Sequence, residues 1–95
     1  MPVLQIEHPV RDFEAWKAAF DGGQERREVG NVRRYEVYRP VDDPNYIAVD
    51  LEFDSRDEAE AFKLGLEQMW QSPQAARVLG GVPRARIVDI VESKR

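Results

Sequence analysis

The sequence predicts a single α+β domain over residues 1–95, with two helices on one face of a four-stranded antiparallel sheet. Four short segments alternate between apolar and polar residues, which is typical of half-buried strands. Two longer segments with apolar residues at helical spacing separate the first strand from the second and the third from the fourth. This β-α-β-β-α-β order is that of the ferredoxin-like arrangement, in which right-handed crossovers place both helices on the same side.

The first strand is predicted over residues 3–7, where Leu4 and Ile6 alternate with polar residues. His8 and Pro9 are expected to end it, because proline cannot donate a hydrogen bond to a neighbouring strand. The helix that follows carries three aromatic residues at spacings of three and four, on one face: Phe13, Trp16 and Phe20.

Local signals mark where that helix begins and ends. Asp12 is suited to the N-cap, and Gly22 is expected to lie just past the end of the helix. The polar segment 24–31 is predicted to form a further helical turn and then a loop, because it ends in Gly30 and Asn31.

The second and third strands, residues 32–39 and 46–53, are predicted to form a hairpin. The segment between them has turn chemistry, with Asp43 and Pro44 in the first two positions of a type I turn. The next helix is predicted to begin at a capping box made by Ser55 and Glu58. Four apolar residues of this helix are expected to face inward: Phe62, Leu66, Met69 and Trp70.

The last part of the chain predicts a short helix that starts at Ser72 and Pro73 and stops at Gly80, and then a strand over residues 86–92. Which face of this strand meets the helices stays open, because apolar residues occur at both parities. Either Val88 and Ile90 or Ile87 and Val91 could face inward. A strand that is apolar on both sides is usually covered on both sides, which suggests a partner.

Strand parity divides the remaining sheet residues between two faces. The face under the helices is predicted to carry Leu4, Ile6, Tyr35, Val37, Ile47, Val49, Leu51 and Phe53. The other face is predicted to carry Val3, Gln5, Glu7, Arg34, Glu36, Tyr38, Tyr46, Ala48, Asp50 and Glu52. This open face is either solvated, as antiparallel sheets tolerate, or it lines a barrel made by two sheets packed face to face. We expect the second arrangement, a homodimer.

Composition excludes several classes of function. Eighteen acidic against fourteen basic residues give a net charge of −4, which argues against nucleic acid as a partner. The chain has no cysteine and one histidine, so no metal site of the usual thiolate or multi-histidine kind is expected. The N-terminal residues do not form a secretion signal and no segment is apolar enough to span a membrane, so we expect a cytoplasmic protein.

Three titratable residues are candidates for catalysis: His8, Asp50 and Glu52. His8 lies at the end of the first strand. A histidine at this position either acts as an acid or base, or caps the strand with a hydrogen bond. Glu7, Asp50 and Glu52 share a parity on the first and third strands, which are expected to be parallel neighbours at the centre of the sheet. A carboxylate enclosed beside like charges holds its proton more tightly and can act as a general base. On a solvated face the same residues have no such role.

Segments throughout the chain resemble a bacterial family of small dimeric α/β-barrel proteins related to antibiotic biosynthesis monooxygenases. The segments are Glu-His-Pro-Val-Arg-Asp-Phe-Glu-Ala-Trp at 7–16, Phe-Asp at 20–21, Val-Asp-Asp-Pro-Asn at 41–45, Glu-Phe at 52–53, Ala-Glu-Ala-Phe at 59–62, Ser-Pro at 72–73 and Gly-Gly-Val at 80–82. The resemblance implies a dimeric α/β barrel. It leaves the activity open, because fold does not determine function.

The wider superfamily includes cofactor-independent oxygenases, haem degraders and polyketide cyclases. Haem degradation is disfavoured, because the resemblance would require an Asn on the first strand, a His on the second helix and a Trp on the third strand, and this sequence has none of the three. The oxygenases imply a cavity between helices and sheet for a small aromatic or polyketide-like molecule, with no cofactor. Four residues are approximate candidates for lining it: Trp16, Tyr35, Tyr46 and Trp70. The alternative is a non-enzymatic domain for small-molecule binding or assembly.

Overall fold

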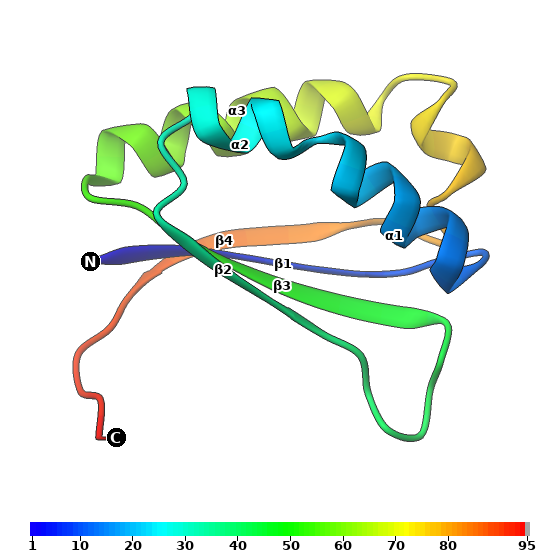
Figure 1. The fold of residues 1–95 in the computed structure, drawn as a ribbon, viewed down its shortest axis with the longest axis horizontal. Coiled ribbons are helices and arrows are strands. Elements are labelled where there is room, and N and C mark those ends of the chain that lie inside the picture. Colours follow the sequence, from blue (N-terminus) through cyan, green and yellow to red (C-terminus); the bar gives the residue numbers. More distant parts are fainter. Residues whose placement is uncertain (95) are drawn as a thin grey trace.

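A computed structural model describes residues 1–94 and shows the predicted βαββαβ fold (Figure 1). The elements are β1 (Pro2–Pro9), α1 (Phe13–Gly22), α2 (Gln24–Val29), β2 (Arg34–Tyr38), β3 (Tyr46–Glu52), α3 (Arg56–Trp70), the 3₁₀ turn η1 (Ala75–Arg77) and β4 (Arg84–Asp89). The strands form one four-stranded sheet in the order β2-β3-β1-β4. All three helices lie on the same side of this sheet, as Figure 1 shows.

Every neighbouring pair of strands is antiparallel, including β1 and β3 at the centre. The expectation that β1 and β3 run parallel was therefore wrong. The helical crossover through α1 brings the chain back so that β2 runs in the direction of β1, and the β2–β3 hairpin then reverses β3. Register pairs Gln5 with Asp50 and Glu7 with Ala48.

The predicted starts of α1 and α3 are confirmed by side-chain caps, whereas Gly22, expected just past the end of α1, is its last residue. The Asp12 carboxylate accepts a hydrogen bond from the Ala15 amide at 2.9 Å, at the start of α1. Ser55 and Glu58 form both hydrogen bonds of the capping box at the start of α3. Both caps satisfy amides that the first helical turn leaves without partners. The polar segment after α1 is helical, as predicted, and forms α2.

The core lies between the helices and the sheet, and the predicted parity is confirmed for all eight sheet residues placed there. Leu4, Ile47 and Phe53 are fully buried within it. Tyr35 pairs with Leu51 on this same face, but its side chain is 49% exposed. β2 is an edge strand, so the helices cover it less than they cover the two central strands.

The register of β4 settles the question that the sequence left open. Ile87 pairs with Leu4 and shares its face, so it packs under the helices, whereas Val88 pairs with Val3 on the open face. The strand ends at Asp89, three residues before the predicted end, and Ile90 and Val91 beyond it are exposed.

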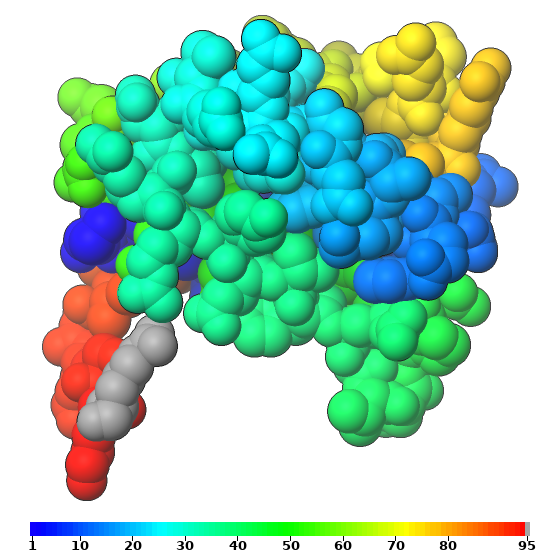
Figure 2. Space-filling view, in the orientation of Figure 1, coloured from blue at the N-terminus to red at the C-terminus, as the bar shows by residue number. Residues whose placement is uncertain are grey.

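Two segments project from the sheet on the side away from the helices. They are the turn between β2 and β3 and the C-terminal segment after β4 (Figure 1). The space-filling view in Figure 2 shows an open recess between these two projections. The open face of the sheet is therefore bordered at both ends but left without a covering element. Among residues 1–94, no helix is long and apolar enough to cross a membrane.

Candidate functional site

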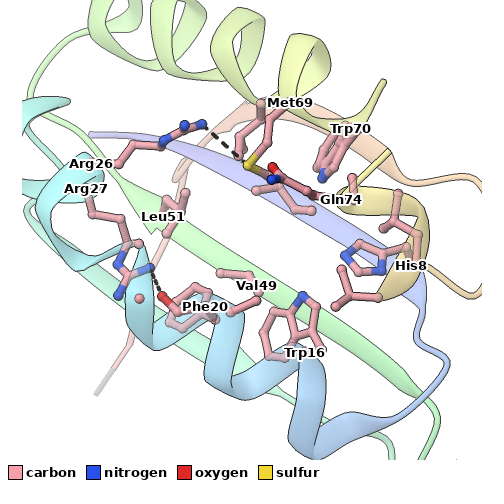
Figure 3. Close-up of a pocket in the computed structure, with 18 of the residues that line it drawn as sticks. His8, Trp16, Phe20, Arg26, Arg27, Val49, Leu51, Met69, Trp70 and Gln74 are labelled. Carbon is pink, nitrogen blue, oxygen red and sulfur yellow. Dashed lines mark hydrogen bonds between the residues drawn. The ribbon is translucent and has the colours of Figure 1, made fainter. Parts of the chain in front are cut away.

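A half-open cavity of about 690 Å³ lies between the helices and the sheet. Its floor is formed by apolar residues of β1 and β3, and its walls come from α1 and α2 on one side and from α3 and the η1 turn on the other (Figure 3). The volume falls within the range of about 300–1,000 Å³ that small-molecule pockets occupy. The aromatic residues of α1 and α3 therefore do not fill the space between helices and sheet.

His8 lies at one end of this cavity and is 3% exposed (Figure 3). Its Nδ1 is 2.8 Å from the carbonyl oxygen of Pro9, which can only accept, so Nδ1 carries the proton. The neutral ring then has Nε2 as an unprotonated acceptor. Burial lowers the pKa of His8 below 6.5, and the hydrogen bond to Pro9 opposes this only in part. His8 is thus held as a neutral base at pH 7.

Aromatic rings surround His8 on both sides of the cavity. The Trp16 and Trp70 rings meet the imidazole edge-on, at centroid distances of 6.3 and 6.4 Å. Trp16 stacks in turn on Phe20 at 5.2 Å, so one wall is a row of rings that leads away from His8. Such walls favour flat aromatic ligands, because ring faces and edges interact favourably.

Arg27 lies at the other end of the cavity (Figure 3). Its guanidinium carbon is 3.9 Å from the centroid of Phe20, and Nη1 donates a hydrogen bond to the Phe20 carbonyl oxygen at 2.6 Å. The side chain is 8% exposed, although it is charged. The cavity therefore combines a neutral base at one end with a cation at the other.

Three of the seven residues proposed from the sequence meet in this cavity: His8, Trp16 and Trp70. Tyr35 lies just outside it, where its ring packs edge-on against Phe20 at 5.3 Å. Tyr46 lies on the open face of the sheet and donates a hydrogen bond to Glu7 at 2.8 Å. That hydrogen bond raises the pKa of Tyr46 above 10.0.

Asp50 and Glu52 also lie on the open face, so the sheet separates them from His8. Asp50 accepts a hydrogen bond from the Tyr38 hydroxyl at 3.2 Å. Desolvation, followed by the charge of Asp50, raises the pKa of Tyr38. Glu52 is 3.4 Å from Arg34, with which it forms an ion pair. The structure thus does not bring the acidic residues together with the histidine.

Two cavity residues were not predicted from the sequence. Arg27 was not a candidate at all, and Met69 was expected to pack in the core. Arg27 stands in a polar segment that carries no apolar stripe, so no local signal indicates burial. Met69 is 38% exposed and its sulfur lies 3.4 Å from Nη1 of Arg26, which links α2 to α3 at the cavity. Within residues 1–94, no cluster of three His, Asp or Glu side chains is placed to hold a metal ion.

Comparison with solved structures identifies the fold, whereas no family model and no curated protein matches the sequence. A protein of unknown function from Nitrosomonas europaea superposes with a TM-score of 0.72 at 13% identity, covering 99% of this chain and 92% of that one. A dimeric ferredoxin-like protein from an uncultured marine organism gives 0.70 at 12% identity, covering 98% and 96%. The chain has the ferredoxin-like fold.

A second Nitrosomonas europaea protein with this ferredoxin-like fold is provisionally described as an antibiotic biosynthesis monooxygenase. It matches with a TM-score of 0.70 at 19% identity, over 92% of this chain and 86% of that one. The fold expected from the sequence resemblance is thus confirmed over nearly the whole chain. At these identities the likeness extends to the fold alone, so the function has to be argued from the cavity.

Proposed function

We propose that the cavity binds a small aromatic molecule and that His8 removes a proton from it. The observation that carries this proposal is the buried, neutral imidazole of His8 at the end of an aromatic-walled cavity of about 690 Å³. A general base must be unprotonated at the operating pH in order to accept a proton. Burial lowers the pKa of His8 and so keeps its imidazole neutral at pH 7.

The protons within reach of such a base are those of phenols and of C–H groups beside an aryl ketone. Removal of either proton leaves an electron-rich anion. This anion can give electrons to O₂, which is the chemistry of a cofactor-independent monooxygenase, or it can attack a carbonyl of the same molecule, which is the chemistry of a cyclase. The aromatic row that leads from Trp16 to Phe20 would hold the flat substrate in either case.

Anthrone tests the oxygenase form of this proposal, because its acidic methylene reacts with O₂ to give anthraquinone and water. Oxidation should be faster with the protein than in buffer by about 10²- to 10⁴-fold, as expected for one positioned base. The measurement is O₂ uptake together with anthraquinone absorbance, without added metal or cofactor. Because anthrone also oxidises slowly by itself, the rate must increase in proportion to protein concentration.

The alternative, a domain that binds a small molecule without turning it over, makes a different prediction. Trp16 and Trp70 both line the cavity and are the two tryptophans of the chain, so ligand binding should change the fluorescence. Quenching by anthrone without faster oxidation would favour binding alone. Absence of both effects would contradict the proposal that this cavity accepts aromatic molecules.

We also propose that two copies of the chain pair through their open sheet faces. Val88 gives this face a partly exposed apolar residue beside the buried Val3, and Ile90 and Val91 are exposed in the segment that projects on the same side (Figure 1). The face is also mixed in charge, since Arg84 and Arg86 of β4 lie beside acidic residues of β1 and β3. Arginines of one copy can therefore meet carboxylates of the other.

Sedimentation equilibrium at micromolar concentration should give twice the chain mass of 11.0 kDa. The substitution Val88→Asp should shift the protein towards one-chain mass, because a face-to-face interface would bury the new charge without a partner. Leu64→Asp is the matched control, because Leu64 is exposed on α3, away from the open face. A wild-type protein that sediments as 11.0 kDa would contradict the dimer.

A further inference from the structure

Among residues 1–94, the buried guanidinium of Arg27 has no acidic partner. Within the part of the chain that the structure describes, ion pairs join Lys17 to Asp21, Arg33 to Asp54, Arg34 to Glu52 and Lys63 to Glu67, and none includes Arg27. Its Nε is buried and has no hydrogen-bond partner. Buried charges in proteins are normally paired, so this cation needs an explanation.

The contacts that Arg27 does make account for only part of its hydrogen-bonding capacity. Phe20 provides one acceptor and one ring face, and the Tyr35 ring lies 5.1 Å from the guanidinium carbon. These contacts hold the group in place by cation–π attraction but leave the Nε–H unsatisfied. A guanidinium cannot shed its proton to escape burial, so an anion is the partner that relieves it.

We infer that Arg27 binds the acid group of the ligand, so that the molecule held in this cavity is an aromatic carboxylate or an equivalent aromatic anion. The inference rests on the proposed function, because it assumes that the cavity holds an aromatic molecule. The Nη groups of an arginine donate charge-assisted hydrogen bonds to carboxylate oxygens, and Arg27 lines the cavity. With that group at Arg27, the rings extend along Phe20 and Trp16 towards His8 at the far end (Figure 3).

The location of Arg27 also determines which part of the ligand reacts. Arg27 and His8 lie at opposite ends of the cavity, so an acid group held by Arg27 directs the opposite end of the molecule to the imidazole (Figure 3). The side chain of Glu25 also lines the cavity but is exposed, so it does not neutralise the buried guanidinium. Arg27 is thus a specificity-determining residue rather than a catalytic one.

Two probes that differ only in charge test this inference: 2-naphthoate and its neutral amide, 2-naphthamide. Their dissociation constants can be measured from the fluorescence of Trp16 and Trp70. The wild-type protein should bind 2-naphthoate at least about tenfold more tightly, as expected for a charge-assisted hydrogen bond in a buried site. Arg27→Met should abolish this preference and keep the affinity for 2-naphthamide, whereas Arg27→Lys should keep part of the preference.

Arg56→Met is the control for loss of one positive charge, because Arg56 is exposed on α3 and does not line the cavity. It should leave the preference unchanged. If the wild type binds both probes equally, Arg27 has only a structural role and the inference is overturned, while the proposed function stands. If neither probe binds, both are overturned. If Arg27→Met fails to fold, the affinities of the wild-type protein for 2-naphthoate and 2-naphthamide still decide the question.

Discussion

His8→Gln should lower the rate of anthrone oxidation by about 10²- to 10⁴-fold, the usual contribution of a positioned general base. Glutamine keeps a polar side chain that can donate a hydrogen bond to the Pro9 carbonyl oxygen, as Nδ1 of His8 does at 2.8 Å. It cannot accept a proton at neutral pH. The variant should therefore still fold and bind anthrone, as measured by tryptophan quenching, but should not oxidise it faster than buffer does.

The same assay has a pH dependence whose direction follows from burial. The pKa of His8 is lowered from 6.5, so the imidazole stays neutral and active at pH 7 and above. The rate should fall only when the pH drops below 6.5 and passes through the lowered pKa, where His8 becomes protonated. The residual oxidation rate of His8→Gln should not show this fall at low pH. A midpoint above 6.5 would contradict the lowered pKa.

Asp50→Asn provides the matched control for this experiment. Asp50 lies on the open face, on the other side of the sheet from the cavity, so removing its charge should leave anthrone oxidation unchanged. An equal loss of rate in Asp50→Asn and His8→Gln would show that the acidic face takes part. Wild-type oxidation that persists in His8→Gln would remove His8 from the proposed mechanism.

Gly80→Ala should destabilise the fold by about 1–3 kcal/mol or more, because there is no room for a methyl group. A Cβ at Gly80 would lie 2.9 Å from the backbone carbon and 3.0 Å from the backbone oxygen of Val10. Such backbone atoms cannot rotate away as a flexible side chain can. The Gly80 amide also donates to the Pro9 carbonyl oxygen at 3.0 Å, the same oxygen that holds Nδ1 of His8.

Urea unfolding at one fixed protein concentration measures this loss, with Gly65→Ala as the control. Gly65 lies inside α3, and nothing would come within 4 Å of a Cβ there. Alanine should therefore stabilise this helix by about 0.5–1 kcal/mol. If the two variants have the same stability, the close approach of Gly80 to Val10 is not a constraint on the fold.

The sequence by itself determined the features that depend on neighbouring residues. Asp12 and Ser55 begin helices because a cap needs only a side-chain oxygen and the amides of the next turn. Alternation placed Leu4, Ile47 and Val49 on one face of the sheet, because the strand period of two follows from backbone geometry alone. These local rules were enough to predict the order of the elements and thus the fold class.

Only the tertiary structure decided where the functional groups meet. His8, Trp16, Arg27 and Trp70 come from four segments, and no local pattern specifies the distances between them. The inward face of β4 likewise depended on its register against β1, since both faces of that strand are apolar. Arg27 became a buried cation because α2 packs its polar sequence against Phe20 and Tyr35. Burial of this kind is a long-range property, which residue type and spacing do not encode.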